Sequence, residues 1–293
     1  VHTAGDLRAG QPVAPLPPLV PGAASPRLPG KFIWADLVTD NVPAARDFYA
    51  RLLGWKFQDL GSYTIALNDG EPVAGLFQRP RPNTGSATPR WFGYISVADV
   101  QATRAEVVRA GGRVLAEPQS MARRGEQAVF ADPEGALFGV LNSSAGDPPD
   151  FLAAEGDWIW IQLMSRDASK ASDFYRRIAG YDVVANTASN RLSDYVLTSQ
   201  GFARATVRTL PTTAKEWNPT WLPFVRVKDI PATVQQAAEL GGKVTIAPRP
   251  DLFSGRLAVL TDPTGAAFGV LQWSPEELGK GDRSEEHTSE LQS

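Results

Sequence analysis

Residues 130–141 read FADPEGALFGVL and residues 260–271 read LTDPTGAAFGVL, so one pattern occurs twice in the chain, 130 residues apart. In each copy an Asp-Pro turn stands between two apolar runs, which predicts a β-hairpin. Similar segments at a fixed long spacing indicate a duplicated structural unit. The chain is therefore predicted to contain two copies of one module, each ending in this hairpin.

A second pair of similar segments lies upstream of the hairpins. Residues 36–55 read DLVTDNVPAARDFYARLLGW, residues 164–181 read MSRDASKASDFYRRIAGY, and their Phe-Tyr pairs are 126 residues apart. Each segment begins with a strand-like run, and an Asn or Asp follows that can cap a helix. The predicted helix has one apolar face and ends at a glycine. The spacing between matching residues changes once, from 126 to 130, and with this single change the two copies align over their whole length. Each copy is predicted to contain a strand and a helix followed by further strands, twice in succession, which makes the fold class α+β.

The repeat predicts the domain boundaries. The first module is expected at residues 31–142 and the second at 156–273. Residues 143–155 read SSAGDPPDFLAAE and are rich in Ser, Gly and Pro, as a linker between domains should be. The chain is thus predicted to have two domains and a short linker.

Both ends of the chain are expected to lie outside these modules. Residues 1–30 contain seven prolines among Ala and Gly, which predicts a disordered leader that adds nothing to the core. Residues 274–293 are predicted to be a tail, and residues 283–293, RSEEHTSELQS, resemble an in-frame translation of a sequencing-adapter oligonucleotide. The leader also resembles the tether of an exported bacterial protein, so the localisation stays open between cytoplasmic and exported.

Taken together, the duplicated strand–helix segments and hairpins resemble the vicinal oxygen chelate superfamily, which includes glyoxalases, bleomycin-resistance proteins and extradiol dioxygenases. The resemblance covers about 240 of the 293 residues. It implies that each module is a pair of βαβββ units, which form a partly closed eight-stranded sheet around a cavity. It also implies that the two modules pair within one chain as separate subunits do in single-module relatives, so we expect an intramolecular pseudo-dimer and a monomeric chain.

In relatives that use a metal, the resemblance implies ligands from the first strand, from the strand that opens the second unit, and from the last strand. The matching positions carry Trp34, Phe92 and Gly139 in module one and Trp160, Leu222 and Gly269 in module two. None of these side chains binds a metal. The chain has no cysteine, and its two histidines, His2 and His287, lie in the terminal segments. We therefore expect no metal site and no other cofactor.

The first strand of each module supplies the candidate site residues. Trp34 and Asp36 share one face of their strand, as do Trp160 and Gln162, because side chains alternate with a period of two. One interpretation is an aromatic cavity wall with a polar group in each module, where Asp36 is the candidate general acid or base. The other is that the tryptophans fill the core and that Asp36 is a structural carboxylate.

The strand that opens the second unit supplies further candidates. Four aromatic residues are expected to border the cavities as ligand-binding residues, although core packing is the alternative: Trp91, Tyr94, Trp221 and Phe224. Three arginines flank glycines in the loop before the penultimate strand, namely Arg123, Arg124 and Arg256. A solvated loop is favoured for them over contact with an anion.

Composition excludes several classes of function. The net charge is −3 and there is no long basic run, so neither nucleic acid nor an anionic membrane is an expected partner. No segment approaches the roughly 18 apolar residues of a membrane-spanning helix.

Three functional hypotheses remain. The first is a metal-independent protein that binds a small aromatic or conjugated molecule. The second is a glyoxalase-like lyase, or a hydroxylase- or dioxygenase-type enzyme, that uses Asp36 for proton transfer. The third is a structural or interaction protein whose cavities have closed. Ligand binding separates the third hypothesis from the other two, and turnover separates the second from the first.

Overall fold

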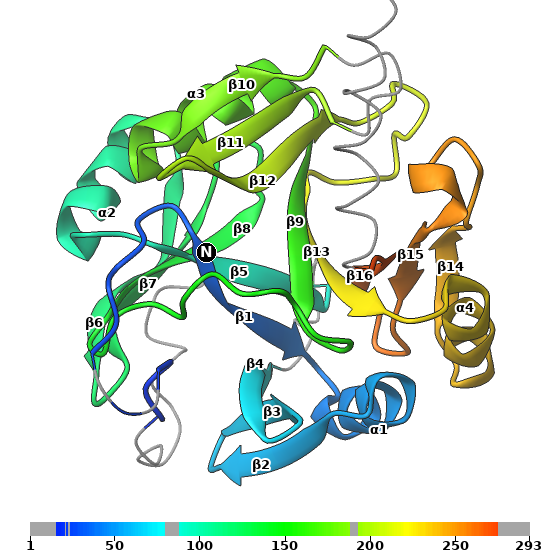
Figure 1. Cartoon of the computed structure of the whole chain (residues 1–293). Helices are drawn as coiled ribbons and strands as arrows, with labels where there is room; N and C mark the ends of the chain where they lie inside the picture. Colours follow the sequence, from blue (N-terminus) through cyan, green and yellow to red (C-terminus); the bar gives the residue numbers. More distant parts are fainter. Residues whose placement is uncertain (1–15, 21, 23, 80–87, 188–192, 275–293) are drawn as a thin grey trace, which may run out of the picture.

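The computed structural model of the protein describes residues 16–20, 22, 24–79, 88–187 and 193–274 (Figure 1). The predicted repeat appears as two eight-stranded sheets, one for each module, with two α-helices in each module. The sheets are curled but not closed, which confirms the predicted α+β fold. Within the described residues, no helix is both long enough and apolar enough to cross a membrane.

The first module runs from β1 to β8. Its elements are β1 (Phe32–Thr39), α1 (Val42–Leu53), β2 (Lys56–Leu60), β3 (Tyr63–Asn68), β4 (Glu71–Gln78), β5 (Arg90–Ser96), α2 (Val100–Arg109), β6 (Arg113–Met121), β7 (Gly125–Ala131) and β8 (Leu137–Ser143). The strand order is β2-β3-β4-β1-β5-β8-β7-β6. The two βαβββ units therefore meet at the antiparallel pair β1 and β5 in the middle of the sheet.

The second module repeats this arrangement. Its elements are β9 (Trp158–Ser165), α3 (Ala168–Ala179), β10 (Asp182–Ala185), β11 (Tyr195–Ser199), β12 (Phe202–Thr209), β13 (Thr220–Val227), α4 (Ile230–Glu239), β14 (Lys243–Ile246), the 3-10 helix η2 (Phe253–Gly255), β15 (Leu257–Thr261) and β16 (Ala267–Gln272). The strand order is β10-β11-β12-β9-β13-β16-β15-β14. Here β9 and β13 form the central antiparallel pair.

The predicted helix ends are confirmed. The side chain of Asn41 accepts a hydrogen bond from the Ala44 amide at 3.1 Å, and Asp167 does the same for Lys170 at 3.1 Å. Helix α1 ends at Gly54, which has a φ of 76°, and helix α3 ends at Gly180, which has a φ of 71°. A left-handed residue at this position satisfies the last helical carbonyls, and glycine adopts it without steric cost.

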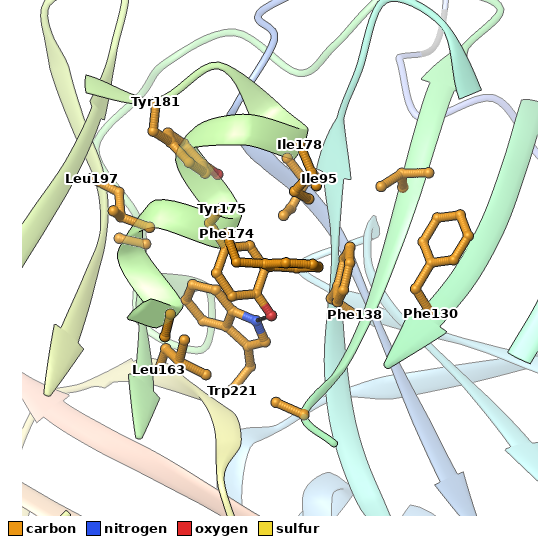
Figure 2. Packing of buried hydrophobic residues seen from close by; sticks show 14 of the residues in the cluster. Ile95, Phe130, Phe138, Leu163, Phe174, Tyr175, Ile178, Tyr181, Leu197 and Trp221 are labelled. Atoms are coloured by element: carbon orange, nitrogen blue, oxygen red, sulfur yellow. Dashed lines mark hydrogen bonds between the residues drawn. The ribbon is translucent and has the colours of Figure 1, made fainter. Parts of the chain in front are cut away.

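The sheet faces that carry the helices pack against each other, and the two modules share two hydrophobic cores. One core joins the second unit of module one to the first unit of module two, and the other core joins the remaining two units. Figure 2 shows the first core, in which Phe138 of β8 lies 5.3 Å from Tyr175 of α3, measured between ring centroids. Helices α2 and α3 lie side by side over this core (Figure 1). Burial of apolar surface between the modules therefore contributes to the folding of both.

Two hydrogen-bonded chains cross the contact between the modules in a symmetric way. The Trp91 indole N–H donates to the Tyr49 hydroxyl at 2.8 Å, and this hydroxyl donates to Asp262 of module two at 2.8 Å. The reciprocal chain runs from Trp221 through Tyr175 to Asp132 of module one. The Asp-Pro hairpins were predicted as turns, and the structure shows that their aspartates also connect the two modules.

The described part of the leader lies against module one. Leu16 is 7% exposed, and Leu19 packs against the cluster that contains Trp34. The Leu28 amide donates a hydrogen bond to Asp147 at 2.5 Å. The sequence predicted a disordered leader over residues 1–30, whereas its described residues contact the body, because its leucines find apolar partners there. Residues 1–15 and 275–293, including the adapter-like segment, lie outside the described residues.

Candidate functional site

The sheet face of each module that is turned away from the shared cores is called the concave face. In module one this face carries a buried polar cluster around Asp36. The Trp34 indole N–H and the Tyr63 hydroxyl donate to Asp36 Oδ1 at 2.9 and 2.6 Å, and the Tyr94 hydroxyl donates to Oδ2 at 2.9 Å. Asp36 is only 4% exposed. The predicted residues Trp34, Asp36 and Tyr94 are thus brought together. Tyr63 was not predicted, because only the pairing of β3 with β4 brings it to this face.

The structure corrects the placement of two predicted site residues. Trp91 and Trp221 lie on the opposite faces of their strands from Tyr94 and Phe224, and they belong to the cores shared by the modules. The reason is strand alternation, since residues three apart point to opposite faces. On the concave faces their places are taken by Phe92 and Leu222, respectively.

Two glycines make room for the cluster. A Cβ atom on Gly75 would lie 1.7 Å from the Tyr63 hydroxyl oxygen, and a Cβ on Gly139 would lie 2.3 Å from the Tyr94 ring. Neither distance is possible for a larger residue without movement of the ring. The absence of side chains at these two positions therefore lets both tyrosines reach the Asp36 carboxyl group.

Burial raises the pKa of Asp36 above its ordinary value, and the donors Tyr63, Tyr94 and Trp34 together with the charge of Arg124 oppose this shift. The same burial, together with the Asp36 charge, raises the pKa of Tyr63 and of Tyr94 well above the ordinary value. Both tyrosines therefore remain hydrogen-bond donors at neutral pH. The ionisable group in this cluster whose pKa moves toward neutrality is Asp36.

We expect the raised pKa of Asp36 to be visible in the pH dependence of stability. Between its ordinary pKa and its raised folded pKa, the folded protein holds a proton that the unfolded chain has released. The contribution of Asp36 to the free energy of unfolding therefore decreases as pH rises through this range. Urea unfolding between about pH 4 and pH 8 should show Asp36→Asn gaining stability relative to the wild type as pH rises.

A matched control for this measurement is Asp59→Asn. The hydrogen bond with Arg46 lowers the pKa of the exposed Asp59. Its pH dependence is therefore opposite to that of Asp36: the small contribution of Asp59 to the free energy of unfolding is present at higher pH and is lost on acidification. A difference between Asp36→Asn and the wild type that does not change with pH would show that the pKa of Asp36 is not raised.

Module two lacks the ionisable group of this cluster. The register places Gln162 where module one has Asp36, and Phe224 where module one has Tyr94. The Trp160 indole N–H donates to the Thr206 hydroxyl at 2.9 Å instead of a carboxylate. As expected from the sequence, the two concave faces differ chemically, since module two has an amide and an aromatic ring in place of an acid and a phenol.

The residues present do not fit a metal ion of the kind that metal-using relatives hold. The positions implied by the resemblance carry Trp34, Phe92 and Gly139 in module one, and the Tyr94 ring occupies the space beside Gly139. The Asp36 carboxyl group already accepts three hydrogen bonds. Within the part of the chain that the structure describes, no three His, Cys, Asp or Glu side chains cluster as metal ligands would.

A cavity of about 870 Å³ lies between the two modules, beneath the linker. Its wall includes linker residues 148–154 and an aromatic set that comes from both modules, the last member following β16: Phe32, Trp34, Trp158, Trp160 and Trp273. Trp34 and Trp160 were both predicted as ligand-binding residues, and this one cavity brings them to a common space. The sequence did not predict this arrangement, because the cavity forms only where the starts of β1 and β9 approach each other.

Charged side chains hold the linker over the cavity. The Lys31 ammonium group donates to the carbonyl oxygen of Pro148 at 2.6 Å and lies 3.2 Å from Asp150 Oδ1. Arg204 of β12 donates to the same Asp150 oxygen at 2.7 Å. Burial lowers the pKa of Lys31, and Asp150 opposes this shift. One carboxylate therefore joins a residue from each module and fixes the roof of the cavity.

Comparison with known proteins relates this fold to a large superfamily. Residues 31–140 match the Glyoxalase/Bleomycin resistance protein/Dioxygenase superfamily, and residues 159–271 match the Glyoxalase-like domain family. The anthracycline biosynthesis protein DauV of Streptomyces sp. (strain C5) is 34% identical over 260 residues, covering 83% of this chain and 94% of DauV. The putative glyoxylase CFP32 of Mycobacterium bovis is 30% identical over 250 residues, covering 83% and 95%.

Solved structures agree on the fold. The Mn(II)-bound glyoxalase from Novosphingobium aromaticivorans has a TM-score of 0.57 at 17% identity and covers 84% of this chain and 82% of its own. The substrate complex of homoprotocatechuate 2,3-dioxygenase from Brevibacterium fuscum has a TM-score of 0.58 at 12% identity, covering 88% and 84%. With its two tandem family matches and its full-length relatives, the chain belongs to the Glyoxalase/Bleomycin resistance protein/Dioxygenase superfamily, also called the vicinal oxygen chelate superfamily.

Proposed function

We propose that the protein binds a flat aromatic small molecule in the cavity between its modules and does so without a metal ion. The observation that carries this proposal is the cavity itself, whose volume of about 870 Å³ lies in the range of ligand sites. Its aromatic wall suits a conjugated ring system, because stacked and edge-on aromatic contacts add to the gain from burial. Two relatives, DauV and DnrV, are named for anthracycline biosynthesis, which supports a polycyclic aromatic ligand.

The proposal is tested by titrating the full chain with an anthraquinone and following tryptophan fluorescence and the melting temperature. Saturable quenching and a rise in melting temperature are expected, since a ligand that binds only the folded state stabilises it. Trp160→Ala should weaken binding about tenfold, because it removes one aromatic wall of the cavity. Trp217→Ala is the matched control, since this tryptophan lies in the loop before β13 and does not line the cavity.

The metal-free part of the proposal has its own measurement. Dialysis against EDTA should leave both the binding curve and the melting temperature unchanged. The reason is that the positions where the resemblance implies metal ligands carry no side chains that bind a metal. Elemental analysis with about one transition-metal ion per chain, together with binding lost on chelation, would contradict it. Failure of every polycyclic aromatic probe to bind would instead favour a structural or interaction protein.

Proton transfer at Asp36 is the second candidate function, and the buried cluster around this residue favours it. A carboxyl group whose pKa is raised by burial, and which is hydrogen-bonded to two tyrosine hydroxyls, is the kind of group that exchanges a proton with a bound molecule. Asp36→Asn should then abolish turnover of a ligand while its binding stays measurable. Equal turnover by Asp36→Asn and the wild type would exclude this role.

A further inference from the structure

Arg124 is a buried cation in the turn between β6 and β7. It is 2% exposed, and its guanidinium carbon lies 4.4 Å from the centre of the Trp34 ring. Its Nε and Nη2 atoms have no hydrogen-bond partner among the residues that the structure describes. The sequence predicted a solvated loop arginine here, whereas the side chain points inward and covers the polar cluster of module one.

The two unpaired atoms are the adjacent donors on one side of the guanidinium group. Their N–H bonds are nearly parallel, and this arrangement matches the two oxygen atoms of a carboxylate. Buried N–H donors without an acceptor are destabilising, so these two donors are expected to meet an acceptor. The neighbouring Asp36 does not serve as that acceptor, because its oxygens are bonded to Trp34, Tyr63 and Tyr94.

The backbone of the turn holds Arg124 in this inward position. Arg123 has a φ of 68° and Gly125 a φ of 123°, and a Cβ on Gly125 would lie 2.0 Å from the Asn142 carbonyl oxygen. The Arg124 amide donates to the Met121 carbonyl at 3.1 Å, and its carbonyl accepts from the Ser144 amide at 3.0 Å. Residues held in sparsely populated conformations cluster at ligand sites, where the surrounding structure maintains them.

We propose that Arg124 anchors an anion subsite in module one that takes the carboxylate group of a small organic acid, held on the Nε and Nη2 donors above the Trp34 indole. The subsite is separate from the proposed cavity, although Trp34 borders both. A carboxylate supplies two acceptor atoms and a negative charge, whereas a water molecule supplies one acceptor atom and no charge. Burial raises the pKa of Asp36, which reduces the negative charge that an incoming carboxylate would meet.

The experiment uses acetate as the probe, with acetamide as its neutral analogue of the same shape, at constant ionic strength. Acetate should raise the melting temperature of the full chain in a saturable way, by about 5 °C at large excess over its dissociation constant. Acetamide should give no saturable shift. An equal response to both probes, or no response to acetate, would overturn the proposal.

Three variants locate the effect. Arg124→Gln should remove the response to acetate, while Arg123→Gln, a change at the exposed neighbouring residue, should keep it. If Arg124→Gln fails to fold, Arg124→Lys retains the charge but loses the paired donors, so its affinity for acetate should fall at least tenfold. A wild-type response in Arg124→Gln or Arg124→Lys would overturn the assignment. The aromatic-ligand titration is unaffected by these outcomes, so failure of this proposal and failure of the cavity proposal are distinguishable.

Discussion

Replacing Asp262 by alanine is expected to lower the free energy of unfolding by about 3–5 kcal/mol, because it removes the common acceptor of several buried hydrogen bonds. Asp262 Oδ1 accepts hydrogen bonds from the amides of Thr264, Gly265 and Ala266 and from the Thr264 hydroxyl. Its Oδ2 accepts from the Tyr49 hydroxyl of the other module. Alanine would leave all these donors without their acceptor, several of them buried.

Urea denaturation of the full chain measures this effect. Asp262→Asn should cost less, about 1–2 kcal/mol, because its amide oxygen can still accept from the turn while the bond from Tyr49 is lost. Asp251→Ala is the matched control, since Asp251 is exposed and forms an ion pair with exposed Arg249, so its cost should stay below about 0.5 kcal/mol. An Asp262→Ala protein as stable as this control would show that the turn and the contact between the modules do not depend on the carboxylate.

Features of the fold that depend on neighbouring residues could be predicted from the sequence. The cap at Asn41, the helix end at Gly54 and the turn at Asp132 each follow from a few consecutive side chains and their backbone preferences. The duplication then extended these local predictions to both modules. The second role of Asp132, as acceptor for Tyr175 of the other module, requires the packing of the modules and was therefore not predictable.

The site was predicted only in part, because its residues come from separate strands. Trp34 and Asp36 were placed correctly on one face, since strand alternation relates them directly. Trp91 was grouped with Tyr94 although the two are three residues apart. The register resolves the difference: Tyr94 pairs with Trp34 on the concave face, whereas Trp91 pairs with Leu37 on the other. Only strict counting of alternate positions along this strand could have found the error.

Arg124 lies in an environment that the composition of its loop does not predict. Its loop is polar, and a polar loop usually lies in solvent. The adjoining Gly125 marks a tight turn, and here the turn directs the arginine inward over Trp34. The cavity between the modules had no comparable signal, because β1, β9 and the linker come together only in the folded chain.

The second large effect is expected at Gly139. The family resemblance implies a metal-ligand position here in metal-using relatives, and in this protein the Tyr94 ring occupies the space beside Gly139. A Cβ atom on Gly139 would lie 2.3 Å from that ring, so Gly139→Ala must displace Tyr94 and break its 2.9 Å bond to Asp36. We expect a loss of about 2–3 kcal/mol in the free energy of unfolding, the scale of overpacking in a filled core.

A double-mutant cycle tests whether the Tyr94 ring is the cause. Tyr94→Ala is itself destabilising, but it removes the atoms that the new methyl group would meet, so Gly139→Ala should cost almost nothing in that background. Phe224→Ala is the matched control, because it empties the equivalent place beside Gly269 in module two and should not reduce the cost of Gly139→Ala. If the cost of Gly139→Ala is the same with Tyr94 and without it, the glycine is required for some other reason. The Tyr94 ring would then not explain why position 139 has no side chain.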